Sequence, residues 1–203
     1  MLNLDNIKNS TLHKDPYPYM IVDEAVCSEF SKSIIQDLPT ITVPGSVPSA
    51  QIEQESYFGK LLLALEADDF RNVLSEKFDL DLEGYPVSTT IRGLMRKKDG
   101  RIHTDSKTKV MTILLYLNES WTQDAGRLRI LNNGSDMNDY VAEIPPLFGK
   151  MVVFQVTDNC WHGHTPLEGK RMSLQMNYVT SSKALNKHKF FHTLSAKLKH
   201  WLQ

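Results

Sequence analysis

The chain is poor in cysteine and has no long apolar run. Its 203 residues include two cysteines, Cys27 and Cys160. This number argues against a disulfide scaffold and fits a reducing compartment. No stretch of 18 apolar residues occurs, so we expect no transmembrane helix. The first residues lack a basic region followed by an apolar one, so we expect no signal peptide. A cytoplasmic location is therefore the expected one.

Net charge is also nearly absent. Lysine and arginine total 23 residues and aspartate and glutamate 24, which gives a formal net charge of −1. Bulk charge therefore indicates neither a nucleic-acid partner nor a membrane partner. The chain contains 41% hydrophobic and 23% charged residues, as soluble globular proteins do. Its length fits one domain with a sizeable core, and no repeat or linker divides it, so we predict a single domain over residues 1–203.

Apolar patterning divides this domain into parts. We expect residues 1–16 to form a loosely held lead-in and residues 17–83 to hold an N-terminal strand and helices. The helical part lies between Ser56 and Phe78, where two apolar stripes at helical spacing are expected to cover a sheet. Residues 86–180 are predicted to form a β-rich core.

Two further segments leave alternatives open. Residues 182–203 alternate apolar residues with lysines, which predicts a basic amphipathic helix. We expect it to dock on the core, and a homodimer contact or an anionic surface contact is the alternative. Residues 44–51 contain two prolines, a glycine and serines. This composition predicts an ordinary connector, with a mobile lid over a site as the alternative.

His103, Asp105 and His162 together suggest a metal site. Residues i and i+2 of a strand point to the same face, so His103 and Asp105 would project together from a strand or its end. An imidazole and a carboxylate are two ligands of a 2-His-1-carboxylate triad, which leaves positions open for a co-substrate and dioxygen. His162 follows the strand-like run 151–156 and can supply the third ligand. A lone His-x-Asp is frequent by chance, so its surroundings must decide.

These surroundings are rich in β-strand patterns. Predicted strands cover residues 110–118, 125–131, 151–156 and 171–178. The last one alternates strictly between an apolar and a polar face. Its polar face consists of Arg171, Ser173, Gln175 and Asn177. A polar face that points into a barrel needs a ligand or partners, and exposure to solvent is the alternative.

The order of motifs resembles that of the Fe(II)/2-oxoglutarate dioxygenases, and more narrowly their prolyl-4-hydroxylase-like branch. The order is His-x-Asp, Tyr-Leu-Asn, Gly-x-Leu-x-Ile, Pro-x-x-Gly-x-x-x-x-Phe, then His and Arg, within residues 86–180. A looser likeness covers residues 17–23. The resemblance implies an α+β protein with a double-stranded β-helix core of jelly-roll or cupin-like type, and helices on the outer face of its major sheet. It also implies Fe(II), 2-oxoglutarate and O2, with ascorbate as an optional reductant.

The resemblance assigns His103, Asp105 and His162 as the catalytic iron ligands. Arg171 would bind the far carboxylate of 2-oxoglutarate, because a guanidinium grips a carboxylate through two parallel hydrogen bonds. It stands nine positions after His162, a spacing like the family's. This spacing favours His162 over His164 as the third ligand, and His164 remains a candidate for a substrate-side role.

Three further residues would serve the co-substrate. Tyr116 matches the position whose hydroxyl helps to hold 2-oxoglutarate in related enzymes, and a core tyrosine is the alternative. Thr112 and Leu128 would form pocket wall. Near the site, a predicted turn at Asp99 is surrounded by basic residues: Arg96, Lys97, Lys98 and Arg101. This cluster is either a solvated turn or a basic rim that attracts an anionic substrate.

The leading hypothesis is therefore an oxygenase that couples conversion of 2-oxoglutarate to succinate and CO2 with hydroxylation of a C–H bond. The alternatives are a non-catalytic β-barrel module that binds a ligand or partner, and a cupin-like metal-dependent hydrolase or isomerase. A dicarboxylate clamp made of Arg171 and Tyr116 is needed only for the oxygenase. The prime substrate stays open among a protein side chain, a saccharide, a lipid headgroup and a small metabolite.

Overall fold

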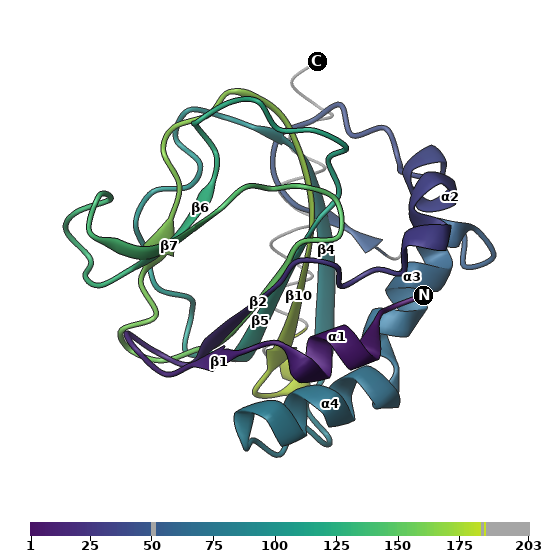
Figure 1. Cartoon of the computed structure of the whole chain (residues 1–203), viewed down its shortest axis with the longest axis horizontal. Coiled ribbons are helices and arrows are strands. Elements are labelled where there is room, and N and C mark those ends of the chain that lie inside the picture. The colour runs from purple at the N-terminus through teal and green to yellow at the C-terminus, as the bar shows by residue number, and fades with distance from the viewer. Residues whose placement is uncertain (50–51, 184, 186–203) are drawn as a thin grey trace.

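Two antiparallel β-sheets pack against each other in the computed structural model (Figure 1), which describes residues 1–49, 52–183 and 185. Within these residues the larger sheet has seven strands. Their order across the sheet is β1 (Leu12–His13), β2 (Tyr19–Val22), β8 (Met151–Gln155), β5 (Lys109–Tyr116), β10 (Gly169–Val179), β4 (Val87–Met95) and β3 (Val47–Pro48). The smaller sheet has the order β7 (Tyr140–Ile144), β6 (Leu128–Leu131) and β9 (His162–Gly163).

Helices cover the outer face of the larger sheet (Figure 1). They are α1 (Leu4–Asn9), η1 (Ser28–Phe30), α2 (Ser31–Gln36), α3 (Tyr57–Glu66) and α4 (Asp68–Phe78). The Ser56 hydroxyl caps α3 by accepting from Gly59 N at 2.9 Å, which satisfies one of the free N–H groups of the first turn. The apolar stripes of α3 and α4 are buried in the same core cluster as Ile113, Val153 and Met176.

The inner face of the larger sheet has two halves of different character. Over β2, β8 and β5 it is apolar, and residues such as Phe154 pack against Leu128 and Ile144 of the smaller sheet. Over β10 and β4 it is polar and lines a cavity. The register places side chains in rows across three strands: Arg92, Ser173 and Tyr116; Thr90, Gln175 and Leu114; Ser88, Asn177 and Thr112. The alternation predicted for residues 171–178 is therefore confirmed, with its polar face turned to the cavity.

The predicted strands of the core all occur, but the prediction that residues 1–16 form a loosely held lead-in was wrong. Residues 1–16 contain α1 and β1, and Ile7 of α1 is fully buried. A six-residue helix is marginal by itself, so this burial rather than its sequence pattern stabilises it. Strands β7 and β9 were not predicted, and β9 has only two residues.

Residues 44–49 form part of the larger sheet. Val47 and Pro48 of β3 pair with Ile91 and Thr90 of β4, and Ser46 lines the cavity. Ser46 therefore contributes to the lining of the cavity at this edge of the sheet. The predicted C-terminal helix lies almost wholly outside the described residues. Among those residues, no helix is long and apolar enough to cross a membrane.

Candidate active site

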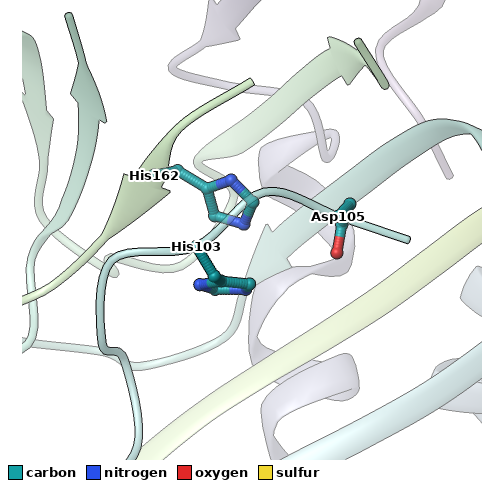
Figure 2. A group of neighbouring side chains, drawn as sticks. All are labelled: His103, Asp105 and His162. Carbon is teal, nitrogen blue, oxygen red and sulfur yellow. The ribbon is translucent and has the colours of Figure 1, made fainter. Parts of the chain in front are cut away.

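Side chains of His103, Asp105 and His162 converge (Figure 2), and all three residues line the cavity. One potential ligand atom from each lies within 4.8 Å of the other two. His103 and Asp105 lie in the loop between β4 and β5 rather than in a strand, so the strand geometry considered for them does not apply. An isolated bridge instead fixes His103: its N–H donates to His162 O at 3.1 Å, and His162 N donates to His103 O at 3.0 Å.

Both histidines have a defined orientation and tautomer. His103 Nδ1 lies 2.8 Å from Arg101 O, and His162 Nδ1 lies 2.8 Å from Cys160 O. A carbonyl oxygen only accepts hydrogen bonds, so in the neutral ring each Nδ1 carries the proton. Each Nε2 then keeps its lone pair, which is the arrangement of a metal-ligating histidine whose other nitrogen is fixed by a backbone carbonyl.

Asp105 is held on both carboxylate oxygens. Lys109 Nζ donates to Oδ1 at 2.7 Å, and the Thr112 hydroxyl donates to Oδ2 at 2.5 Å. Burial raises the pKa of Asp105, but Lys109, His162 and Thr112 outweigh this effect and lower the pKa to about 2. Burial lowers the pKa of His162 to about 4. At neutral pH the site therefore offers an ionised carboxylate and a neutral imidazole, the protonation states that a metal ion requires.

The cavity beside these ligands has a volume of about 340 Å³. Arg171 lies in its wall with only 5% of its surface exposed. Its Nε donates to Gly126 O at 2.7 Å, and its Nη2 lies 3.3 Å from the Tyr116 hydroxyl, to which it donates. No carboxylate of the described chain lies within ion-pair distance of this guanidinium. The cavity therefore contains an oriented cation that can bind a carboxylate of a ligand.

The other residues predicted for the co-substrate lie at different depths. Thr112 and Leu128 line the cavity. Tyr116 is fully buried behind Arg171 and is not among the lining residues, so it contacts the guanidinium rather than the open space. His164 lines the cavity, but it lies outside the group of three candidate ligands and donates through Nδ1 to Thr165 O at 2.8 Å.

The basic turn contributes less to the cavity than its sequence suggests. Arg96 forms an ion pair with Asp99 at 2.9 Å, and exposed Lys97 lies 3.8 Å from Glu168. Neither side chain lines the cavity. Two other cations do line it, Arg92 and Lys109. In the sequence, Arg92 lies in an alternating run, residues 87–95, but such a run does not reveal which strand pairs with it.

Comparison with known proteins finds a family match in the β-rich part of the chain. Residues 93–179 match the family described as the 2OG-Fe(II) oxygenase superfamily. The matched segment includes the three converging candidate ligands and Arg171. This part of the chain is therefore similar to the 2OG-Fe(II) oxygenases. The match confirms the resemblance seen in the sequence, and similarity to this superfamily implies Fe(II), 2-oxoglutarate and O2. Two imidazole nitrogens and one carboxylate fit Fe(II), and Arg171, which has no carboxylate partner among the described residues, fits a dicarboxylate co-substrate.

Solved structures of prolyl hydroxylases have a fold similar to that of this chain. A prolyl-4-hydroxylase from Pseudomonas putida aligns with a TM-score of 0.58 and 18% identity over 88% of this chain and 97% of that one. One from Phytophthora capsici aligns with a TM-score of 0.60 and 14% identity over 87% and 65%, respectively. A Trichoplax adhaerens prolyl hydroxylase in complex with a hypoxia inducible factor peptide fragment aligns with a TM-score of 0.51 and 15% identity. That alignment covers 91% of this chain and 90% of the other. No curated protein matches the sequence.

Proposed function

We propose that the protein is a hydroxylase that consumes 2-oxoglutarate and O2 and inserts one oxygen atom into a C–H bond of a second substrate. The products would be the hydroxylated substrate, succinate and CO2. One observation carries this proposal: one potential ligand atom each of His103, His162 and Asp105 converges beside a cavity that contains Arg171, which has no carboxylate partner among the described residues. Neither a binding module nor a cupin-like hydrolase or isomerase requires that buried cation.

The residues divide into a metal group and a co-substrate group. His103, Asp105 and His162 would hold Fe(II), which when bound supplies the redox chemistry that activates O2. Lys109 and Thr112 keep the Asp105 carboxylate in place through the bonds described above. Their hydrogen bonds and the Nδ1 contacts of the histidines fix the ligand set before a metal arrives, which reduces the cost of ordering it.

Arg171 would bind the far carboxylate of 2-oxoglutarate through its fork of N–H groups. Gly126 O and the Tyr116 hydroxyl take two of its bonds and orient the guanidinium. Tyr116 would thus serve the co-substrate through Arg171, whereas Thr112 and Leu128 would form the wall against which it lies. The Phe154 ring lies 4.8 Å from the ring of His162. Apolar neighbours such as Phe154 would keep water away from the buried side of the proposed metal site.

We further propose that the two sheets are those of a double-stranded β-helix, and that residues 1–203 form one oxygenase domain. The antiparallel pairing of β8, β5, β10 and β4 and the packing of β6 and β7 against them support the first point. The single core cluster that joins α1, α3 and α4 to the larger sheet supports the second. A homodimer contact, a cytoplasmic location and a role for ascorbate remain predictions.

A peptide or protein side chain is the substrate class that the comparisons favour. The structural relatives are prolyl hydroxylases, and one of them is bound to a peptide fragment. Sequence identities of 18% and 15% show a shared fold but not a shared substrate, so a saccharide or a small metabolite is the alternative.

Binding and turnover of 2-oxoglutarate test the proposal. Protein loaded with Mn(II) without oxygen should bind 2-oxoglutarate, and protein with Fe(II), ascorbate and O2 should release succinate slowly even without the prime substrate. Asp105→Ala should abolish both. Asp158→Ala is the control, because Asp158 is exposed and pairs only with Lys107 among the described residues. Absence of 2-oxoglutarate binding to the metal-loaded parent would refute the proposed function.

A further inference from the structure

The cavity contains a second guanidinium, that of Arg92. Arg92 comes from β4 and Arg171 from the neighbouring β10, where Arg92 pairs in register with Ser173. Both side chains line the same cavity. The Arg92 side chain makes one recorded hydrogen bond, from Nε to Ser46 Oγ at 2.9 Å. Within the described ranges, no carboxylate lies within 4.0 Å of its guanidinium nitrogens.

This lack of a carboxylate partner separates Arg92 from other partly exposed arginines of the chain. Arg96 pairs with Asp99, and both Arg127 and Arg129 pair with Glu143. An arginine that serves only the fold usually has such a partner, because burying an uncompensated charge is costly. Arg92 instead keeps most of its five N–H donors for other contacts.

The surroundings of Arg92 increase this cost. Burial lowers the pKa of Arg92, the positive charges of Arg171 and Arg96 lower it further, and Asp99 and Asp105 raise it. A guanidinium nevertheless stays protonated in proteins, so the cavity has two positive charges close together. A bound anion would relieve this repulsion.

The co-substrate accounts for only one of the two cations. In the proposed function, one carboxylate of 2-oxoglutarate goes to the metal and the other to Arg171. Neither remains for Arg92. Arg171 is also the more deeply buried of the two and is already oriented by Gly126 and Tyr116. Arg92 lies towards β3, at the side of the cavity that Ser46 closes.

The polar half of the inner sheet extends around Arg92. Thr90 and Gln175 form the next row, and both line the cavity together with Ser173. These groups can donate to or accept from a polar ligand. The other half of the inner face is packed with apolar side chains against the smaller sheet. The space available to a second substrate is therefore the space over β10 and β4.

We propose that Arg92, assisted by Ser46, binds an oxyanion group of the prime substrate, either a carboxylate or a phosphate. The inference rests on the proposed function, because 2-oxoglutarate at Arg171 is what leaves Arg92 for the second substrate. An oxyanion matches the guanidinium fork and satisfies the charge that the protein leaves unpaired. It would hold one end of the substrate while the C–H bond lies beside the metal ligands.

The test uses two small probes on protein loaded with Mn(II) and 2-oxoglutarate without oxygen. Inorganic phosphate and acetate are titrated, and the paramagnetic relaxation of their ³¹P and ¹³C nuclei by Mn(II) reports binding inside the cavity. We expect saturable relaxation with at least one probe. Arg92→Gln should weaken its binding roughly tenfold or more, because a charge-assisted pair is lost. Arg96→Gln is the control, because Arg96 bonds Asp99 outside the cavity and should bind like the parent.

The outcomes separate the two proposals. Binding of phosphate alone assigns a phosphate ester, and binding of acetate alone assigns a carboxylate. Absence of both, or equal binding by Arg92→Gln and the parent, overturns the inference. The inference is also overturned if Arg92→Gln protein no longer binds 2-oxoglutarate and Arg92→Lys protein, which keeps the charge and must be folded, shows the same loss of 2-oxoglutarate binding. If the parent itself fails to bind 2-oxoglutarate, the proposed function fails first.

Discussion

Lys109 and Asp105 form an ion pair of 2.7 Å in which the side chains are only 11% and 8% exposed. Asp105 is a proposed metal ligand, so the pair ties the metal site to the first residue of β5. In protein without metal, Lys109 balances the buried carboxylate. A bound divalent cation would take over much of that role.

Replacing Lys109 tests this relationship. Lys109→Met should lower the free energy of unfolding of the metal-free protein by about 3 kcal/mol, because the buried carboxylate loses its cation. Mn(II) should restore more than half of the loss, since a ligand that binds only the folded state stabilises it. Urea unfolding with and without Mn(II) measures both values.

Lys107→Met is the matched control for this experiment. Lys107 pairs with Asp158 at the same 2.7 Å, but the two side chains are 86% and 82% exposed. An exposed pair is worth little, so this variant should lie within about 0.5 kcal/mol of the parent in both conditions. An equal loss in Lys109→Met with and without Mn(II) would contradict the link between Lys109 and the metal site.

Arg171→Lys should raise the KM for 2-oxoglutarate strongly and leave metal affinity nearly unchanged. Lysine keeps the charge but cannot form two parallel bonds to a carboxylate. The loss of about 1.5–3 kcal/mol corresponds to roughly ten- to a hundredfold in binding. Uncoupled succinate formation at varied 2-oxoglutarate concentration measures it. An unchanged KM would mean that the carboxylate is bound elsewhere.

Tyr116→Phe should have a smaller effect of the same kind. The hydroxyl accepts from Arg171 Nη2 at 3.3 Å, a long bond, and Tyr116 does not line the cavity. Without the hydroxyl the guanidinium is less well oriented, so the binding free energy of 2-oxoglutarate should weaken by about 1 kcal/mol, which raises its KM roughly fivefold. If Tyr116→Phe proves as damaging as Arg171→Lys, the tyrosine contacts the co-substrate itself.

His162→Ala and His164→Ala should differ sharply. His162 belongs to the converging group of candidate ligands, whereas His164 lies outside it. His162→Ala should therefore lose Mn(II) binding and iron-dependent turnover, as should His103→Ala and Asp105→Ala. His164→Ala should keep Mn(II) binding, which calorimetry can measure. The reverse pattern would reassign the third ligand.

The sequence predicted best those features that depend on local patterns. Strict alternation identified the polar face of β10 and thereby placed Arg171, Ser173 and Gln175 in the cavity. The three metal ligands were proposed from spacing and resemblance, and the structure brings their side chains together although two of them lie in a loop.

The sequence did not reveal features that depend on how distant segments pair. Arg92 and Lys109 face the cavity because β4 and β5 flank β10 in a particular register, and side chains switch faces with a one-residue shift. Strand β9 is too short to produce a periodic pattern. Helix α1 is stabilised by tertiary burial of Ile7, which its largely polar sequence does not indicate.

Gly100 gives a final prediction, because it connects the turn before His103 to the cavity wall. Its φ is +80°, and a Cβ placed there would lie 2.2 Å from Cε1 and Nε2 of the His164 ring. The two residues are also joined by a hydrogen bond from His164 N to Gly100 O at 2.8 Å. A side chain at this position must therefore displace the ring and break its bond to Thr165 O, in addition to adopting a left-handed conformation.

Gly100→Ala is best compared with Gly84→Ala. Gly84 has a similar φ of +75° but no atom within 4 Å of a built Cβ, so its substitution measures the backbone cost alone. We expect a loss of about 1 kcal/mol in the free energy of unfolding for Gly84→Ala and roughly 2–4 kcal/mol for Gly100→Ala. Urea unfolding gives both values, and the Nε2 chemical shift of His164 should change only in Gly100→Ala. Equal losses with an unchanged His164 signal would show that the turn and the ring can separate, and that Gly100 serves the turn alone.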